Sequence, residues 1–444
     1  MRRPLGSAVL SLLVALPLAA RAEDLLQVFR DARGFDAQYA SARYALQAGL
    51  EKLPQGRALI LPTLNFTASA ARSDFHVEGR YANPAPGAQR FFTQDIYALT
   101  LTQPLYRPQN YAQYGQSQHQ VKQAEATFGQ AAQDLILRVS QAYFDVLAAQ
   151  DTLELVRAQK AAISEQLAQA KRNFEVGTAT IVDTHEAQAR FDLAVSQEIA
   201  AQNDLDTKLR ALQQITGKVY ARLKPLRSQI TLSPPNPSAM SNWVELTEKQ
   251  AYPVLIQEAV GEIARLEVQR NRAGHLPTLD IVGSYQQTNQ TASVLTAQGS
   301  LLGQGAIGLQ FALPLYAGGG LSSREREAAA NYEKAKQDLE NARRSSVLAT
   351  QQSYLSVING IAQVKALEQA LVSSQSALDS NKLGYEVGVR INIDVLNSQQ
   401  QLYSTRRDLA VARYNTITNH LRLKAAAGGL RDDDLEDVNR ALEP

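Results

Sequence analysis

The sequence contains no cysteine, and this absence excludes several kinds of protein. It rules out a disulfide framework, a zinc site built on thiolates, and a lipid anchor on an N-terminal cysteine. The five histidines are scattered, with no pair at metal-ligand spacing. We therefore expect no metal site and no cofactor. No catalytic triad is apparent either, so the chain is not predicted to be an enzyme.

The chain also has little net charge and few long apolar runs. A net charge of +2 over 444 residues gives no electrostatic footprint for nucleic acid. At the N-terminus, Arg2 and Arg3 precede an apolar stretch over 5–20, and Ala20-Arg21-Ala22 fits a cleavage site. Residues 1–22 are therefore predicted to be a secretory signal peptide. Beyond it, no run reaches the roughly 18 apolar residues of a membrane-spanning helix, so the exported chain could enter a membrane only by strands.

Proline is missing from 109–224 and from 315–443. Apolar residues recur there at spacings of three and four, which predicts very long amphipathic helices that turn and run back. About 65 residues of helix would span roughly 100 Å. The apolar stripe is narrow and rich in alanine, so neighbouring helices can pack closely, as in a coiled coil or a helical array.

Two segments far apart in the chain are copies of one another. Residues 174–183 and 385–394 share an aromatic residue, Glu-Val, Gly and a terminal Asp without a gap, at an offset of 211. Pro104-Leu105-Tyr106 and Pro314-Leu315-Tyr316 match at nearly the same offset. A near-constant offset over about half of the chain indicates a duplicated protein. Each copied segment lies between two long helices, so each is predicted to be a helix-turn-helix tip.

Four shorter segments alternate with a period of two. Apolar side chains alternate in them with Thr, Ser, Asn, Gln, Gly and Ala, which predicts strands with one apolar face. These strands are expected at 63–72, 92–103, 278–286 and 304–313. Four strands cannot close a barrel, and an open edge in lipid leaves backbone groups unpaired. Strands that span a membrane would therefore need several chains to share one barrel. A soluble pair of hairpins packed on the helices is the alternative.

These patterns divide the chain into two repeats. Each is expected to contain a first helix (24–60 or 246–273), two strands joined by a polar loop (76–90 or 287–303), a long helix, a tip and a return helix. The predicted domains are repeat 1 at 23–216, a linker or equatorial segment at 217–245, repeat 2 at 246–425, and a C-terminal equatorial tail at 426–444.

Several motifs resemble the TolC family of outer-membrane channel proteins. They are Gly274-His275-Leu276-Pro277-Thr278-Leu279-Asp280, both Pro-Leu-Tyr strand ends, the segment 142–147, Arg413-Tyr414-Asn415 and both tips. The resemblance runs over essentially the whole mature chain. It implies a mainly α fold with a small β part, assembled as a homotrimer. Four strands per chain would form a shared twelve-stranded β-barrel in outer-membrane lipid, and the coiled helices an α-barrel in the periplasm of a Gram-negative type of cell. The missing cysteine sets the chain apart from lipid-anchored members.

The resemblance implies a passive exit duct for type I protein secretion, multidrug efflux or both. Such a duct is recruited by a periplasmic adaptor protein and an inner-membrane transporter, either an ABC ATPase or a proton-driven pump. The competing hypothesis is a periplasmic coiled-coil adaptor or another structural component of an export system. The four amphipathic strands favour the duct, because an adaptor needs no strands that face lipid.

The resemblance also assigns roles to the tips. Asp183 of the first tip would accept hydrogen bonds from Tyr385 and Arg390 of the second and so lock the gate. Asp394 would form an acidic ring at the pore constriction. Asn397 stands where the family has a second acid, so this ring should carry less charge.

The outermost turns, Gly177-Thr178 and Gly388-Val389, would meet the adaptor. Simpler explanations exist for the same residues. Asp183 and Asp394 each begin a return helix and can serve as helix caps. The two glycines permit a turn with positive φ.

Overall fold

The computed structural model describes residues 22–74, 91–220, 222–227, 230, 232–292 and 298–443. The predicted signal peptide up to residue 21 and the predicted loop 76–90 lie outside the described residues. The chain forms two compact units. The first comprises Met1–Ala40, Ala132–Trp243 and Thr350–Pro444, and the second Ser41–Ala131 and Val244–Ala349.

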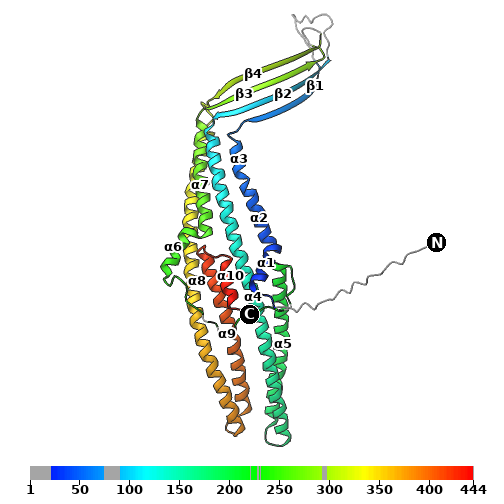
Figure 1. The fold of residues 1–444 in the computed structure, drawn as a ribbon, viewed down its shortest axis with the longest axis vertical. Helices are drawn as coiled ribbons and strands as arrows, with labels where there is room; N and C mark the ends of the chain where they lie inside the picture. Colours follow the sequence, from blue (N-terminus) through cyan, green and yellow to red (C-terminus); the bar gives the residue numbers. More distant parts are fainter. Residues whose placement is uncertain are drawn as a thin grey trace, which may run out of the picture. The chain divides into compact units, whose positions relative to one another are not determined.

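The second unit contains one antiparallel sheet of four strands in the order β1-β2-β3-β4 (Figure 1). The strands are β1 (Thr63–Asp74), β2 (Phe91–Tyr106), β3 (Thr278–Gln290) and β4 (Ser300–Ala312). They lie where the alternating pattern predicts them, but each is longer than expected. The predicted polar loop 287–303 was wrong at both ends, because β3 continues to Gln290 and β4 already starts at Ser300.

The pairing register places like side chains side by side across the sheet. Two rows of paired residues lie on the apolar face: Leu64–Leu101–Gly283–Ile307 and Phe66–Leu99–Tyr285–Gly305. A row on the polar face is Asn65–Thr100–Ser284–Ala306. Directly paired residues share a face, so the predicted separation into an apolar and a polar face is confirmed. The apolar face is uncovered in the single chain, and Ile307 is 82% exposed.

Proline does not end β2 as expected. The strand runs past Pro104 to Tyr106, and its register against β3 shifts between these two residues. A proline is tolerated at such an irregularity, because it has no N–H to contribute to the ladder. Just beyond, Arg107 pairs with the buried Asp280 of β3. Its Nε lies 2.7 Å from Oδ1 and its Nη2 2.5 Å from Oδ2.

The first predicted helix, 24–60, is three helices: α1 (Leu25–Phe35), α2 (Ala37–Leu50) and α3 (Lys52–Ala58). Asp36 interrupts the first two, and its side chain accepts a 2.6 Å hydrogen bond from the Tyr39 backbone N–H. Pro54 does not end a helix but lies in the first turn of α3, where its missing N–H costs nothing.

The predicted helix 246–273 is likewise divided. It consists of α6 (Met240–Gln250) and α7 (Tyr252–Arg272), followed by the short 3-10 helix η1 (Ala273–His275). Pro253 lies in the first turn of α7, just after the break between the two helices. Its position there has the same explanation as that of Pro54 in α3.

The predicted long helices and their return helices are present. They are α4 (Pro108–Glu175), α5 (Ile181–Thr216), α8 (Gly320–Glu386) and α9 (Asn392–Ala426). In the first unit, α5 returns beside α4 and α9 beside α8 (Figure 1). Among the described residues, no helix combines the length and the apolarity that crossing a lipid bilayer requires.

The predicted linker 217–245 is attached to both ends of the described chain. Glu23 forms a parallel bridge with Leu223, and Leu226 an antiparallel bridge with Leu442. The buried Tyr143 hydroxyl of α4 lies 2.8 Å from the Lys224 carbonyl oxygen. In the tail, α10 (Asp433–Arg440) contacts α1. These bridges and contacts attach the linker and the tail to α1 and α4 of the first unit.

Candidate functional site at the helical tips

Both tips turn through the same backbone geometry. Gly177 and Gly388 have φ of 80° and 78°, a conformation that favours glycine. In the first tip, the Thr178 and Ala179 N–H groups donate to one carbonyl, that of Asn173, at 2.8 and 3.2 Å. In the second, Val389 and Arg390 donate to Gly384 at 2.8 and 3.0 Å. The shared glycine thus has the structural role that the sequence suggests, and the copied segments form copied turns.

Asp183 caps its own helix in this chain. Its Oδ2 accepts from the Thr180 backbone N–H at 2.9 Å and from the Thr180 hydroxyl at 2.8 Å. The Asp183 N–H donates back to that hydroxyl at 3.3 Å, which completes a capping box. Within the part of this single chain that the structure describes, neither Tyr385 nor Arg390 donates to Asp183. A lock between them therefore stays a prediction.

The other predicted lock residues have different partners within the chain. The Asn173 side-chain amide donates to the Tyr385 hydroxyl at 3.2 Å. Arg390 pairs with Asp394, with 3.6 Å between Nη1 and Oδ2. Asp394 lies in the first turn of α9, where the helix dipole favours a carboxylate. A guanidinium therefore stands close to the carboxylate that is predicted to form the pore ring.

Asn397 has a partner that sequence reasoning missed. Arg190 of α5 donates from Nη2 to Asn397 Oδ1 at 2.8 Å and from Nη1 to Gln400 Oε1 at 2.7 Å. Farther along, Gln166 of α4 donates to Asn392 Oδ1 at 2.9 Å. These contacts depend on how α4 and α5 are rotated toward α9. No local motif encodes that rotation, so no signal in the sequence could have identified Arg190.

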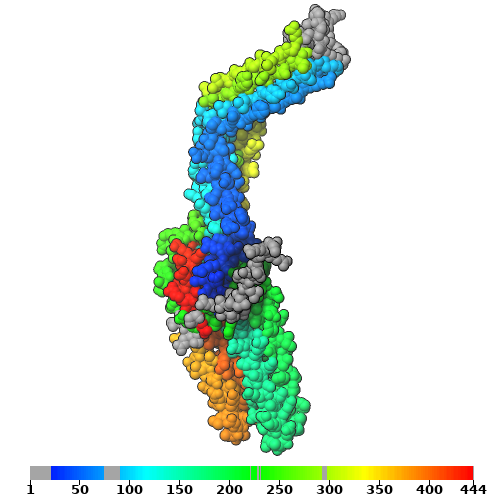
Figure 2. All heavy atoms as spheres, turned by 45° about the vertical axis from the view of Figure 1, so that its right-hand side comes forward, coloured from blue at the N-terminus to red at the C-terminus, as the bar shows by residue number. Residues whose placement is uncertain are grey.

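Each helix pair has an apolar interior. Between α4 and α5, buried Ile163, Leu167 and Ala170 pack with Ala187 and Ala194. Between α8 and α9, one cluster joins Val364 to Leu409 and Ala412, and another joins Leu378 to Val395 and Leu402. Figure 2 shows the α8/α9 pair in orange beside the green α4/α5 pair.

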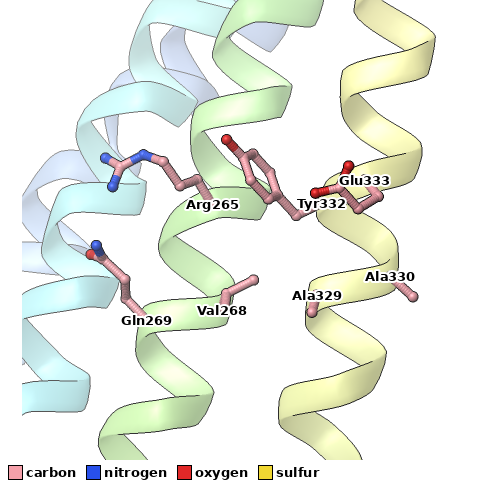
Figure 3. Close-up of a pocket in the computed structure, with 7 residues that line it drawn as sticks. All are labelled: Arg265, Val268, Gln269, Ala329, Ala330, Tyr332 and Glu333. Atoms are coloured by element: carbon pink, nitrogen blue, oxygen red, sulfur yellow. The ribbon is translucent and has the colours of Figure 1, made fainter.

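The second unit has a groove away from the tips. It has a volume of about 510 Å³ and lies between α7 and α8, where Val268 and Ala329 face one another and the Tyr332 ring lies between the two helices (Figure 3). Its remaining lining residues supply charges at the rim but no nucleophile with a base. No group of His, Cys, Asp and Glu that could hold a metal ion occurs in the described ranges.

Comparison with known proteins identifies the family. The family model described as "Outer membrane efflux protein" matches residues 29–218 and 256–429. The outer membrane protein TolC of Vibrio cholerae is 34% identical over 100% of this chain and 99% of its own length. The proteases secretion protein PrtF of Dickeya chrysanthemi is 32% identical over 94% of this chain and 90% of its own.

A solved structure shows the same fold. The outer membrane protein VceC from Vibrio cholerae superposes with a TM-score of 0.79 at 19% sequence identity. The match covers 91% of this chain and 96% of that one. The four strands, the long helices and their order are thus those of outer-membrane channels. This chain belongs to the outer membrane efflux protein family, and it is an outer-membrane export channel that extends into the periplasm.

Proposed function

We propose that three copies of this chain form one continuous export duct, with a shared barrel of twelve strands. The observation that carries the proposal is the sheet. One face is apolar and uncovered, and the outer edges of β1 and β4 pair with no other described strand. Unpaired edges in lipid cost several kcal/mol per backbone group, so they must meet edges of other chains.

The duct would serve as a passive path for cargo delivered by an inner-membrane transporter. The relatives named as secretion proteins and as TolC support both protein secretion and efflux as its uses. A periplasmic adaptor would connect the duct to either an ABC ATPase or a proton-driven pump. The exposed turns at Gly177-Thr178 and Gly388-Val389 offer such an adaptor its docking points. Val389 is 78% exposed there.

The predicted lock fits best between neighbouring chains. Within one chain, Oδ2 of Asp183 accepts both Thr180 bonds, while Oδ1 accepts none from the described residues. The free oxygen can accept a charge-assisted bond from Arg390 or a bond from the Tyr385 hydroxyl of an adjacent protomer. Capping and gating would then use the two oxygens of one carboxylate.

Reconstitution into planar lipid bilayers tests the channel proposal. The purified full-length protein should give discrete, uniform conductance steps, because a closed ring of three chains encloses one pore of fixed size. Step sizes should not change with protein concentration. A protein that inserts without conducting would contradict the proposal.

The competing function is a soluble periplasmic adaptor. A soluble adaptor would leave the apolar face of the sheet in water. Soluble monomers rarely expose an apolar patch of this kind without a partner that covers it. Membrane fractionation separates the two functions. We expect the protein in the outer-membrane pellet after osmotic shock and high-salt washing, and recovery in the soluble periplasmic fraction would favour the adaptor.

A further inference from the structure

The two helix pairs of one chain meet along a polar seam. On one side lie α4 and α5, and on the other α9 with the end of α8. Among the described residues, the four cross-pair hydrogen bonds nearest the tips have their donors in the first pair and their acceptors in the second, whereas farther from the tips Tyr414 of α9 donates to Asp151 of α4. The four bonds are Asn173 to Tyr385, Gln166 to Asn392, and Arg190 to Asn397 and Gln400. Each pair has an apolar interior in addition to its polar bonds, whereas hydrogen bonds predominate at the seam near the tips.

The seam is also incompletely packed. Leu396 of α9 enters the apolar cluster between α4 and α5, but its neighbours on the same face, Asn392 and Gln399, are buried and polar. Asn392 Nδ2 and Gln399 Oε1 have no hydrogen-bond partner among the described residues. Next to Gln400, a groove of about 370 Å³ opens between α4, α5 and α9. Buried polar atoms without partners and a groove both weaken a contact. The polar bonds therefore add to the apolar contact that Leu396 makes across the seam.

The duplication shows that this seam is a separate feature of the chain. Shifting each donor by the repeat offset of 211 gives Ala377 for Gln166, Gly384 for Asn173 and Gln401 for Arg190. None of these can make the same contact. Gln401 instead donates to Thr405 of its own helix at 3.3 Å. The residues that form the turns are shared by the repeats, whereas those that join the pairs differ.

Arg190 stands out among the three donors. It is the charged one, and its planar fork reaches two amide oxygens on successive turns of α9. Charge-assisted bonds are about twice as strong as neutral ones, and two parallel bonds also fix the orientation of the helices. On the same helix, Ala187 and Ala194 are buried in the apolar interior of the α4/α5 pair.

We propose that Arg190 is the clamp that holds the first helix pair against the second within each protomer, with Asn397 and Gln400 as its acceptors. Separation of the pairs, and with it opening of the duct, requires these two bonds to break. The proposal rests on the proposed gating at the tips. It adds a positioning residue that acts inside one protomer, whereas the proposed Asp183 lock acts between protomers.

The clamp also changes the charge of the constriction. Arg390 pairs with the Asp394 carboxylate, and Arg190 binds Asn397, which follows Asp394 by one turn of α9. Two guanidinium groups close to the predicted acidic ring reduce the attraction of its carboxylates for cations. Arg190 therefore affects two measurable properties, opening and ion selectivity, and substitutions can separate them.

The test uses single-channel recording of the full-length protein in planar bilayers with a KCl gradient. We expect R190A to raise the ratio of open to closed time roughly tenfold. This is about the effect of the net free energy that one hydrogen bond to a charged group contributes. It should also shift the reversal potential toward that of potassium. R190K keeps the charge but loses the fork, so it should open more often while its selectivity stays that of the wild type.

The matched control is R406A. Arg406 also donates to a glutamine, Gln375, at 3.1 Å, but this bond lies within the α8/α9 pair and does not cross the seam. R406A should therefore gate like the wild type. The double variant N397A/Q400A should open as often as R190A, and adding R190A to it should cause no further opening, because all three residues form one interaction.

Each outcome has a defined meaning. If R190A gates and selects ions like R406A, or if its effect adds fully to that of N397A/Q400A, Arg190 is not the clamp. A wild-type protein that never conducts would instead overturn the proposed function. The melting temperature of the helices, followed by circular dichroism, should be the same in R190A, R190K and R406A. A large drop in R190A and R190K alone would assign Arg190 to folding and overturn the clamp.

Discussion

At the scale of single residues, two carboxylates are buried among the described residues, and each meets an arginine in bidentate geometry. Asp36 accepts from Arg138 at 2.9 and 3.0 Å, and Asp280 accepts from Arg107. Asp36 stands at the break between α1 and α2, and Asp280 at the base of the sheet. These two buried ion pairs therefore stabilise places where the chain changes direction. The polar contacts at the tips are made by exposed or half-buried side chains.

The first prediction concerns Asp36 and pH. The Arg138 side chain lowers the pKa of Asp36 below its ordinary value of 3.8. A depressed folded-state pKa stabilises the fold above the unfolded pKa, and this contribution is lost as pH falls through the folded pKa. D36N should therefore lower stability by about 3 kcal/mol at neutral pH, and the difference from the wild type should shrink below about pH 4.

Thermal unfolding of the helices by circular dichroism between pH 7 and pH 3 measures this effect. The matched control is D134N. Asp134 shares Arg138, at 3.0 Å, but is about half exposed, so its loss should cost less than about 1 kcal/mol. Equal effects of the two substitutions, or a D36N effect independent of pH, would contradict this account of Asp36.

The second prediction concerns the lock. Replacing Arg390 or Tyr385 with alanine should loosen the tip and raise single-channel conductance by removing a bond to a neighbouring Asp183. Substituting Asp183 itself should do the same, and D183A combined with R390A should be no more conductive than either alone. Additive effects would show that Arg390 acts elsewhere, for instance only on its partner Asp394.

Residue roles were the part of the site least open to prediction from sequence. The capping box of Thr180 and Asp183 has a local signature and could have been recognised as such. The partners of Asn397 and Tyr385 have none, because they lie on helices more than 200 residues away in the chain. Which side chains meet across two helices depends on their rotation about their axes, and a repeated pattern does not determine that rotation.

At the scale of elements, the long helices follow from the absence of proline and the spacing of apolar residues. Their ends lie within a few residues of those expected, and Gly217 stops α5 in a left-handed conformation. The first helix was less well predicted. Asp36 precedes a helical run, which is a start signal, but apolar residues continue beyond it with gaps at helical spacing, and this concealed the break.

The third prediction concerns the faces of β4. Ile307 lies on the apolar face and Ala306 on the polar one. I307K should cost roughly 2–4 kcal/mol if its side chain faces the middle of the bilayer, and should therefore reduce the amount of assembled protein in the outer membrane. The neighbouring substitution A306K would point into the pore and should assemble normally. Equal assembly of both variants would indicate that this sheet does not face lipid.

At the scale of the whole molecule, one chain contributes a four-stranded sheet with two unpaired edges and two helix pairs that meet along the polar seam. Its fold could be predicted in full outline because the duplication, the strand pattern and the family motifs agree. How copies join could not be read from one chain's own pattern, since the edges of β1 and β4 find partners only in other copies. The central claim is that three copies complete the barrel.

Cysteine cross-linking in the outer membrane tests this claim most directly, because the natural chain has no thiol. Cysteine at Ser69 in β1 is combined with cysteine at Gln304, Ala306 or Gly308 in β4. A control pairs Ser69 with Thr100 of the inner strand β2. Under oxidation, at least one edge pair should give bands at two and three chain masses and none beyond, while the control stays monomeric. Monomer in every edge pair, or a ladder that extends past three chains, would contradict the shared trimeric barrel.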